Sequence, residues 1–118
     1  MRIGIPKEIK TREYRVSLTP NSVKALLEHR HEVFVENNAG LGIGFSNTDY
    51  RAAGAQIVDT AEHVFDAADL IVKVKEPLKS EIGLLKRDQV LFTYLHLAAD
   101  LEQTKGLIDS GCVAIAYE

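Results

Sequence analysis

Three polar segments of the sequence carry the side chains best suited to chemistry. The first ends in Arg15, the second contains Lys73 and Lys75, and the third contains Tyr94 and His96. Arginine and lysine hold a carboxylate through charge-assisted hydrogen bonds, and an imidazole exchanges protons near neutral pH because its unperturbed pKa is about 6.5. If the fold gathers these side chains, they suit the binding of a small carboxylate and proton transfer beside it.

Each of these residues has a plainer explanation when it is considered alone. Arg15 lies in a charged loop, where most arginines are only solvated. Lys73 and Lys75 alternate with valines, which places both on one side of a strand and does not decide between them. A lysine at a strand end is often only a soluble edge. His96 lies among apolar residues, where a lone histidine is more often a hydrogen-bonded core residue than a catalyst.

The elements that must position these segments follow from short apolar runs. Runs rich in β-branched residues predict six strands, at residues 2–5, 32–35, 55–58, 70–74, 90–94 and 113–117. Helical segments lie between most of them, which predicts one α/β domain with a mostly parallel sheet and helices on both faces. In such folds ligands bind at the carboxyl ends of the strands, so the three polar segments are expected to meet at one crevice.

Capping residues predict where the helices begin and end. Thr19 before Pro20 is typical of an N-terminus, and Asp100 followed by Gln103 predicts a capping box. The last helix is expected to stop at Gly111. It is expected to bury three apolar residues: Leu101, Leu107 and Ile108.

A glycine-rich segment, Gly40-Leu41-Gly42-Ile43-Gly44, follows an expected strand and invites a dinucleotide-binding interpretation. Its spacing is GxGxG rather than GxGxxG, and Phe45 follows where a dinucleotide loop needs a glycine against a helix. We therefore expect a tight structural loop and no cofactor site in this chain.

Composition excludes several classes of protein. The chain has 118 residues and a net charge of -3, with no basic cluster of the kind that nucleic acid binding needs. No apolar run approaches the length that spans a bilayer. With one cysteine, Cys112, an internal disulfide cannot form. We expect a cytoplasmic protein that binds neither nucleic acid nor membrane, and no metal site.

Three motifs, taken in order, resemble one known superfamily. Residues 3–8 (IGIPKE) with residues 15–20 (RVSLTP) resemble the opening of the alanine dehydrogenase and nicotinamide nucleotide transhydrogenase superfamily, and residues 72–77 (VKVKEP) resemble its second motif. Residues 91–100 (LFTYLHLAAD) are similar to the alanine dehydrogenase branch, because the transhydrogenase branch lacks the histidine. The resemblance covers the whole chain without large gaps.

The resemblance implies a role for each candidate residue. Arg15 would bind the carboxylate of alanine or pyruvate. Lys75 would also contact the substrate, which decides between the two lysines where the strand pattern does not. His96 would be the catalytic acid/base, and Tyr94 would line the same pocket. Glu118 matches an acidic residue near the site.

The same resemblance implies an activity, the reversible NAD-dependent oxidative deamination of L-alanine to pyruvate and ammonia. Residues 1–118 would form the amino-terminal catalytic and substrate-binding domain, of the Rossmann-like or flavodoxin-like type. NAD would be bound by a further domain that this chain lacks, so we expect the chain to be inactive alone. We also expect a homo-oligomer, and apolar residues that face water where the rest of a family enzyme would cover them.

Two alternatives remain open at this stage. One is a transhydrogenase-type subunit domain, against which the histidine of the third motif argues. The other is a stand-alone module that binds small carboxylates or takes part in protein interactions. Assays of alanine oxidation with NAD, beside measurements of pyruvate binding, would distinguish them.

Overall fold

The apolar runs form strands of a single sheet in the computed structural model, which describes all residues, 1–118. The strands are β1 (Arg2–Ile5), β2 (Glu32–Glu36), β3 (Gln56–Val58), β4 (Leu70–Val72), β5 (Val90–Thr93) and β6 (Val113–Ala116). The helices are α1 (Pro20–Glu28), α2 (Asn47–Ala52), α3 (Ala61–Ala67), α4 (Lys79–Ile82) and α5 (Leu101–Ser110), with 3₁₀ turns η1 (Leu41–Ile43) and η2 (Leu97–Ala99). All six predicted strands are confirmed. None of the helices is long and apolar enough to cross a membrane.

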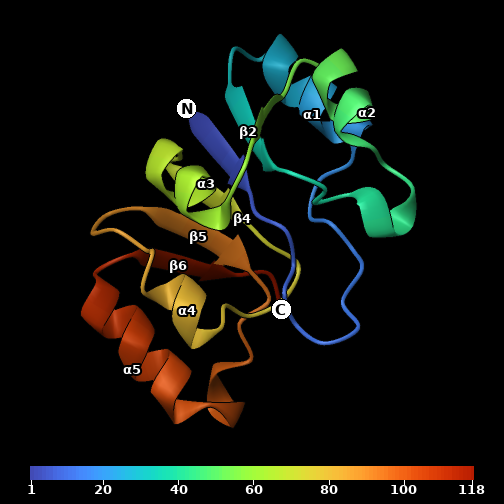
Figure 1. The fold of residues 1–118 in the computed structure, drawn as a ribbon. Coiled ribbons are helices and arrows are strands. Elements are labelled where there is room, and N and C mark those ends of the chain that lie inside the picture. Colours follow the sequence, from blue (N-terminus) through green and yellow to red (C-terminus); the bar gives the residue numbers. More distant parts are fainter.

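The sheet is parallel throughout, and its strand order is β3-β2-β1-β4-β5-β6. β2 and β3 therefore lie on one side of β1, and β4, β5 and β6 lie on the other. In Figure 1, α1 and α2 lie together at the end of the sheet formed by β2 and β3, whereas α4 and α5 lie at the end formed by β5 and β6. The reversal of strand order between β1 and β4 is a topological switch point, where doubly wound folds bind ligands.

Side chains that alternate along the strands divide the core into two clusters, one on each face of the sheet. Ile3 and Ile5 belong to the cluster that includes α1, whereas Ile71 belongs to the cluster that includes α3. Gly4 faces α3, because a Cβ at this position would lie 2.7 Å from Val64 Cγ1. The missing side chain lets α3 approach β1 closely. The predicted α/β fold with helices on both faces is confirmed.

The N-terminus of α5 is capped as predicted, but the predicted capping box is wrong. The Asp100 side chain accepts a hydrogen bond from the backbone N–H of Gln103 at 3.0 Å. The Gln103 side chain does not return a bond to the cap backbone. It is buried and donates to the carbonyl oxygen of Leu95 at 2.7 Å. Gln103 therefore ties the helix to the turn that follows β5.

Only one of the three apolar residues predicted to be buried in α5 is buried. Leu107 is 6% exposed, whereas Leu101 and Ile108 are 66% and 72% exposed. The buried stripe of α5 contains Gln103 and Leu107, which are one helical turn apart. Leu101 and Ile108 lie on a different stripe that faces water, so this part of the prediction is wrong. The helix ends as predicted at Gly111, whose φ of 72° is left-handed.

The face of β5 and β6 opposite the α3 cluster carries exposed apolar side chains. Phe92 pairs with Ile115 in register, and both alternate with the pair formed by Leu91 and Ala114. Leu91 is fully buried in the α3 cluster, whereas Phe92 and Ile115 are 37% and 46% exposed, and Val113 is 48% exposed. As expected, apolar residues of this domain face water.

Candidate active site

The three polar segments leave the sheet at neighbouring strands. Arg15 lies in the loop after β1, Lys75 follows β4, and Tyr94 and His96 follow β5. These strands are adjacent in the sheet and run parallel, so their carboxyl ends lie along one edge. The site is therefore beside the switch point between β1 and β4, the position where doubly wound folds place their ligands.

Lys75, Tyr94 and His96 form a short row of contacts. Lys75 Nζ lies 5.1 Å from the centroid of the Tyr94 ring, a cation–π contact. The rings of Tyr94 and His96 are tilted at 44° with centroids 5.6 Å apart. His96 is exposed, so the alternative that it is a core histidine is wrong. A cation and an imidazole thus both contact one aromatic ring.

The backbone at His96 adopts a conformation that few residues other than glycine occupy. Its φ and ψ of 49° and 47° are left-handed. The amides of Leu95 and His96 donate to Glu118 Oε1 at 3.0 and 2.7 Å. The hydrogen bond from the His96 amide is the main cause that lowers the pKa of the Glu118 carboxyl. Glu118 therefore contacts the backbone of His96, and its role stays a prediction.

Arg15 is already engaged by an acidic neighbour. Glu13 accepts from Arg15 Nη2 at 2.5 Å, from Nε at 2.9 Å and from the Arg15 amide at 3.0 Å. The side-chain hydrogen bond with Arg15 is the main cause that lowers the pKa of Glu13 to about 2, and Lys75 lowers this pKa further through its charge. The two side-chain bonds use two of the five N–H donors of the guanidinium, which leaves donors for a second carboxylate.

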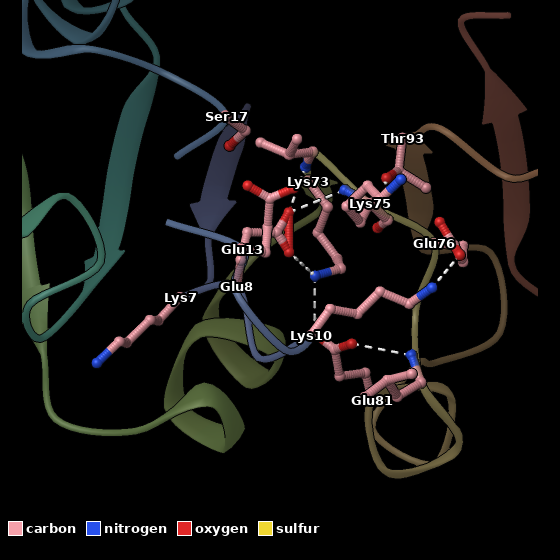
Figure 2. Close-up of polar contacts among 12 residues, drawn as sticks. Lys7, Glu8, Lys10, Glu13, Ser17, Lys73, Lys75, Glu76, Glu81 and Thr93 are labelled. Atoms are coloured by element: carbon pink, nitrogen blue, oxygen red, sulfur yellow. Dashed lines mark hydrogen bonds and ion pairs between the residues drawn. The ribbon is translucent and has the colours of Figure 1, made fainter. Parts of the chain in front are cut away.

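Two clefts, rather than one, surround these residues. One, of about 390 Å³, is lined by the loop after β1 and includes Arg15. The other, of about 450 Å³, lies between the β4 loop, α4 and α5 and includes His96 and Glu76. Lys10 lines both clefts and forms an ion pair with Glu76 (Figure 2). The structure brings Lys75, Tyr94, His96 and Glu118 into one group. Of these residues only His96 lines one of the two clefts, and Arg15 lines the other.

The glycine-rich segment does not fit a dinucleotide. Leu41–Ile43 is a 3₁₀ turn, and Cβ atoms at Gly40 and Gly42 would lie 2.7 Å from Tyr50 Cε2 and 3.2 Å from Tyr14 Cβ. Gly40 and Gly42 therefore pack against aromatic side chains, whereas Gly44 has open space beside it. No group of three or more His, Cys, Asp or Glu side chains is placed to hold a metal ion.

Sequence reasoning missed the acidic residues that organise the site. Glu13 precedes Arg15 by two residues, and this spacing was the one available signal for the ion pair. Glu8 is 7% exposed although it lies in a charged segment typical of a solvated loop. Its partners are about 65 residues away in the chain, and no local pattern predicts such a pairing.

A doubly wound parallel domain with lysine, arginine and histidine beside its switch point belongs to the class of folds that bind ligands at this position. Comparison with known families is more specific. The family described as alanine dehydrogenase/PNT, N-terminal domain, matches residues 4–118, and the chain belongs to this family.

Individual relatives agree with the family. An alanine dehydrogenase from Methanococcus maripaludis is 53% identical over 118 residues, and one from Mycobacterium tuberculosis is 50% identical over the same length. Both alignments cover all of this chain and 32% of the relative, so the chain spans about a third of the length of these relatives.

Solved structures confirm the fold. An L-alanine dehydrogenase superposes with a TM-score of 0.97 at 53% identity, over all of this chain and 32% of that structure. A transhydrogenase from Sinorhizobium meliloti superposes with a TM-score of 0.92 at 30% identity, over 98% of this chain and 34% of that one. The lower identity makes the transhydrogenase alternative the weaker one.

Proposed function

We propose that residues 1–118 are the amino-terminal substrate-binding domain of an NAD-dependent L-alanine dehydrogenase, which interconverts L-alanine with pyruvate and ammonia. The observation that carries the proposal is the row formed by Lys75, Tyr94 and His96 at the carboxyl ends of β4 and β5. This row occurs in a chain about half identical to alanine dehydrogenases. NAD, which accepts the hydride from Cα, is held by residues outside this chain.

The cations bind and orient the substrate. Lys75 and the free donors of Arg15 attract the carboxylate of alanine or pyruvate, and charge-assisted bonds to a carboxylate are the stronger kind. Two cations on different loops also limit rotation of the substrate. Tyr94 contacts both Lys75 and His96, and in this proposal its ring lies beside the bound substrate. Positioning of this sort lowers the barrier by fixing the reacting carbon before chemistry begins.

His96 moves the protons. After hydride removal, water attacks the iminium carbon and gives a carbinolamine, and neutral His96 accepts the proton that the water loses. The imidazolium then gives its proton to the amine, ammonia leaves, and the neutral His96 takes the proton of the carbinolamine hydroxyl as pyruvate forms. Its exposed side chain, at the mouth of a cleft, is accessible to water and substrate. An imidazole serves both directions because its ordinary pKa lies close to neutrality.

Assembly and location complete the proposal. We propose a homo-oligomeric, cytoplasmic enzyme that binds neither nucleic acid nor membrane. The exposed apolar side chains of β5 and β6 support the burial of this face by other parts of the enzyme or by another subunit, since contiguous exposed apolar surface is uncommon on soluble monomers.

Residues 1–118 expressed alone are expected to form no NADH from L-alanine and NAD, because this proposal places the NAD site outside them. The complete enzyme is expected to do so. The complete enzyme here is the protein in which these residues occur naturally. A chimera serves equally: Methanococcus maripaludis alanine dehydrogenase in which residues 1–118 replace the matching segment, which is 53% identical. Absorbance of NADH measures both. Alanine oxidation by the short chain would overturn the domain assignment, and pyruvate binding without turnover by the complete protein would favour a binding module.

Replacing Lys75 or Arg15 with alanine in the complete enzyme is expected to raise the KM for pyruvate by about 10- to 100-fold, the scale of a lost hydrogen bond to a charged group. Steady-state kinetics with pyruvate, ammonia and NADH measure the change. Lys24→Ala, which removes a cation from the exposed side of α1, is the matched control and should leave KM unchanged. Equal KM values for Lys75→Ala and Lys24→Ala would remove Lys75 from the substrate site.

A further inference from the structure

Beneath Lys75 lies a buried group of charges that the proposed chemistry does not use. Lys73, Glu8 and Glu81 are only 2%, 7% and 3% exposed. Lys73 Nζ lies 2.5 Å from Glu8 Oε2 and 2.8 Å from Glu81 Oε2 (Figure 2). The three residues come from β4 or its end, the loop after β1 and the first turn of α4. The cluster therefore joins three elements around the site.

Every carboxylate oxygen of the cluster has a partner. Glu8 Oε1 accepts from the amide of Val74 and, at 3.0 Å, from the amide of Lys75. Glu81 Oε1 accepts from the amide of Leu78 at 2.9 Å. One ammonium and two carboxylates leave a net negative charge, and these backbone N–H groups stabilise it. The two acids thus share Lys73 but hold different stretches of backbone.

The two acids of the cluster stabilise the charge of Lys73. Burial alone would lower the pKa of Lys73, but the charges and hydrogen bonds of Glu81 and Glu8 outweigh it and raise this pKa above its ordinary value. Lys73 contacts no cleft and bonds only to these acids among side chains. It is therefore a fixed counter-charge rather than a proton carrier.

The backbone of Lys75 is held by side chains instead of by a strand. β4 ends at Val72, so the regular ladder does not extend to Lys75. Its amide donates to Glu8, and its carbonyl oxygen accepts from Thr93 Oγ1 at 2.9 Å (Figure 2). Both Glu8 and Thr93 are buried, so neither has the freedom of a surface side chain. Together they fix the point from which Lys75 extends toward Tyr94.

We infer that Glu8 is a positioning residue: through its bonds to Lys73 and to the amide of Lys75, it places the Lys75 ammonium for the substrate carboxylate. This inference rests on the proposed function. Glu8 contacts no substrate itself in this role. Buried ion pairs add little net stability over apolar packing, and their best-attested use is to specify one geometry.

Glu8→Gln in the complete enzyme tests the inference, and Glu81→Gln is its matched control. Both changes remove one buried carboxylate from Lys73, but only Glu8→Gln disturbs the bonds to Lys75. Glu8→Gln is expected to raise the KM for pyruvate by about 10- to 100-fold, the scale of a small misplacement of a binding group. Glu81→Gln is expected to change the KM for pyruvate by less than about threefold. Both variants are expected to lower the melting temperature by a similar amount. The pH profile of kcat, which reports on the acid/base group, should be the same in both variants.

Equal KM values for the two variants would overturn the inference and reduce the cluster to a structural one. If Glu8→Gln does not fold, the pair Glu8→Asp and Glu81→Asp gives the same comparison, because a shorter acid reaches Lys73 or the Lys75 amide but not both. Wild-type activity separates the two proposals. An unaltered complete enzyme that does not act on alanine contradicts the proposed function, whereas an active one with equal variants contradicts only the role of Glu8.

Discussion

Replacing His96 with alanine in the complete enzyme is expected to lower kcat by about two to four orders of magnitude, the usual contribution of a general acid/base. The substrate cations remain in place, so the KM for pyruvate should change much less than kcat. Steady-state rates in both directions, alanine with NAD and pyruvate with ammonia and NADH, measure the loss. A pH profile should also lose the limb that depends on the imidazole.

A second histidine provides the control for this experiment. His63 is exposed on α3, away from the carboxyl ends of β4 and β5, and His63→Ala should leave kcat unchanged. If His96→Ala turns over at a rate close to the wild type, His96 does not transfer protons. In that case its exposure and its contact with Tyr94 would have another purpose.

Replacing Ile71 with alanine is expected to lower the free energy of unfolding of the 118-residue chain by about 2–5 kcal/mol. Ile71 is fully buried in β4, in the cluster that covers the α3 face of the sheet. The change removes its apolar atoms from the core and leaves a cavity that the central strand cannot close. Such a loss is a large share of the total stability of a small domain, which is about 5–15 kcal/mol. Urea denaturation followed by circular dichroism measures it.

The same substitution at an exposed isoleucine shows how much of the lost stability comes from burial rather than from helix or strand propensity. Ile108 is 72% exposed on α5, and Ile108→Ala should change the free energy of unfolding by no more than about 0.5 kcal/mol. If Ile71→Ala and Ile108→Ala lower the free energy of unfolding by similar amounts, then Ile108 is buried in solution.

The strands were predictable because a parallel sheet covered on both faces uses continuous apolar runs. Helix starts were predictable where a cap lies next in sequence, as at Thr19, whose side chain accepts from Ser22 at 3.3 Å. The face of α5 was not predictable, because Leu101 and Leu107 are equally apolar. Which of them is buried depends on where the sheet lies, and sequence spacing does not state this.

For the site, residue types and strand ends predicted that the polar segments after β1, β4 and β5 lie at one edge of the sheet, but the choice of Lys75 over Lys73 came from the family resemblance. The strand pattern failed for the two lysines because β4 ends at Val72 and alternation does not apply beyond it. The pairing of Lys73 with Glu8 spans 65 residues and depends on the packing of three elements. The ion pair of Arg15 with Glu13 was not predicted, and it leaves some of the guanidinium donors free.

Under the proposed function, the left-handed backbone of His96 sets folding against proton transfer at one position. A residue with a Cβ pays about 1–2 kcal/mol for that conformation, and glycine does not. A protein engineered for heat resistance alone would therefore replace His96 with glycine and lose the proton carrier. Stability-guided design of this domain should keep position 96 constant, since the residue that folds best there is not the residue that works.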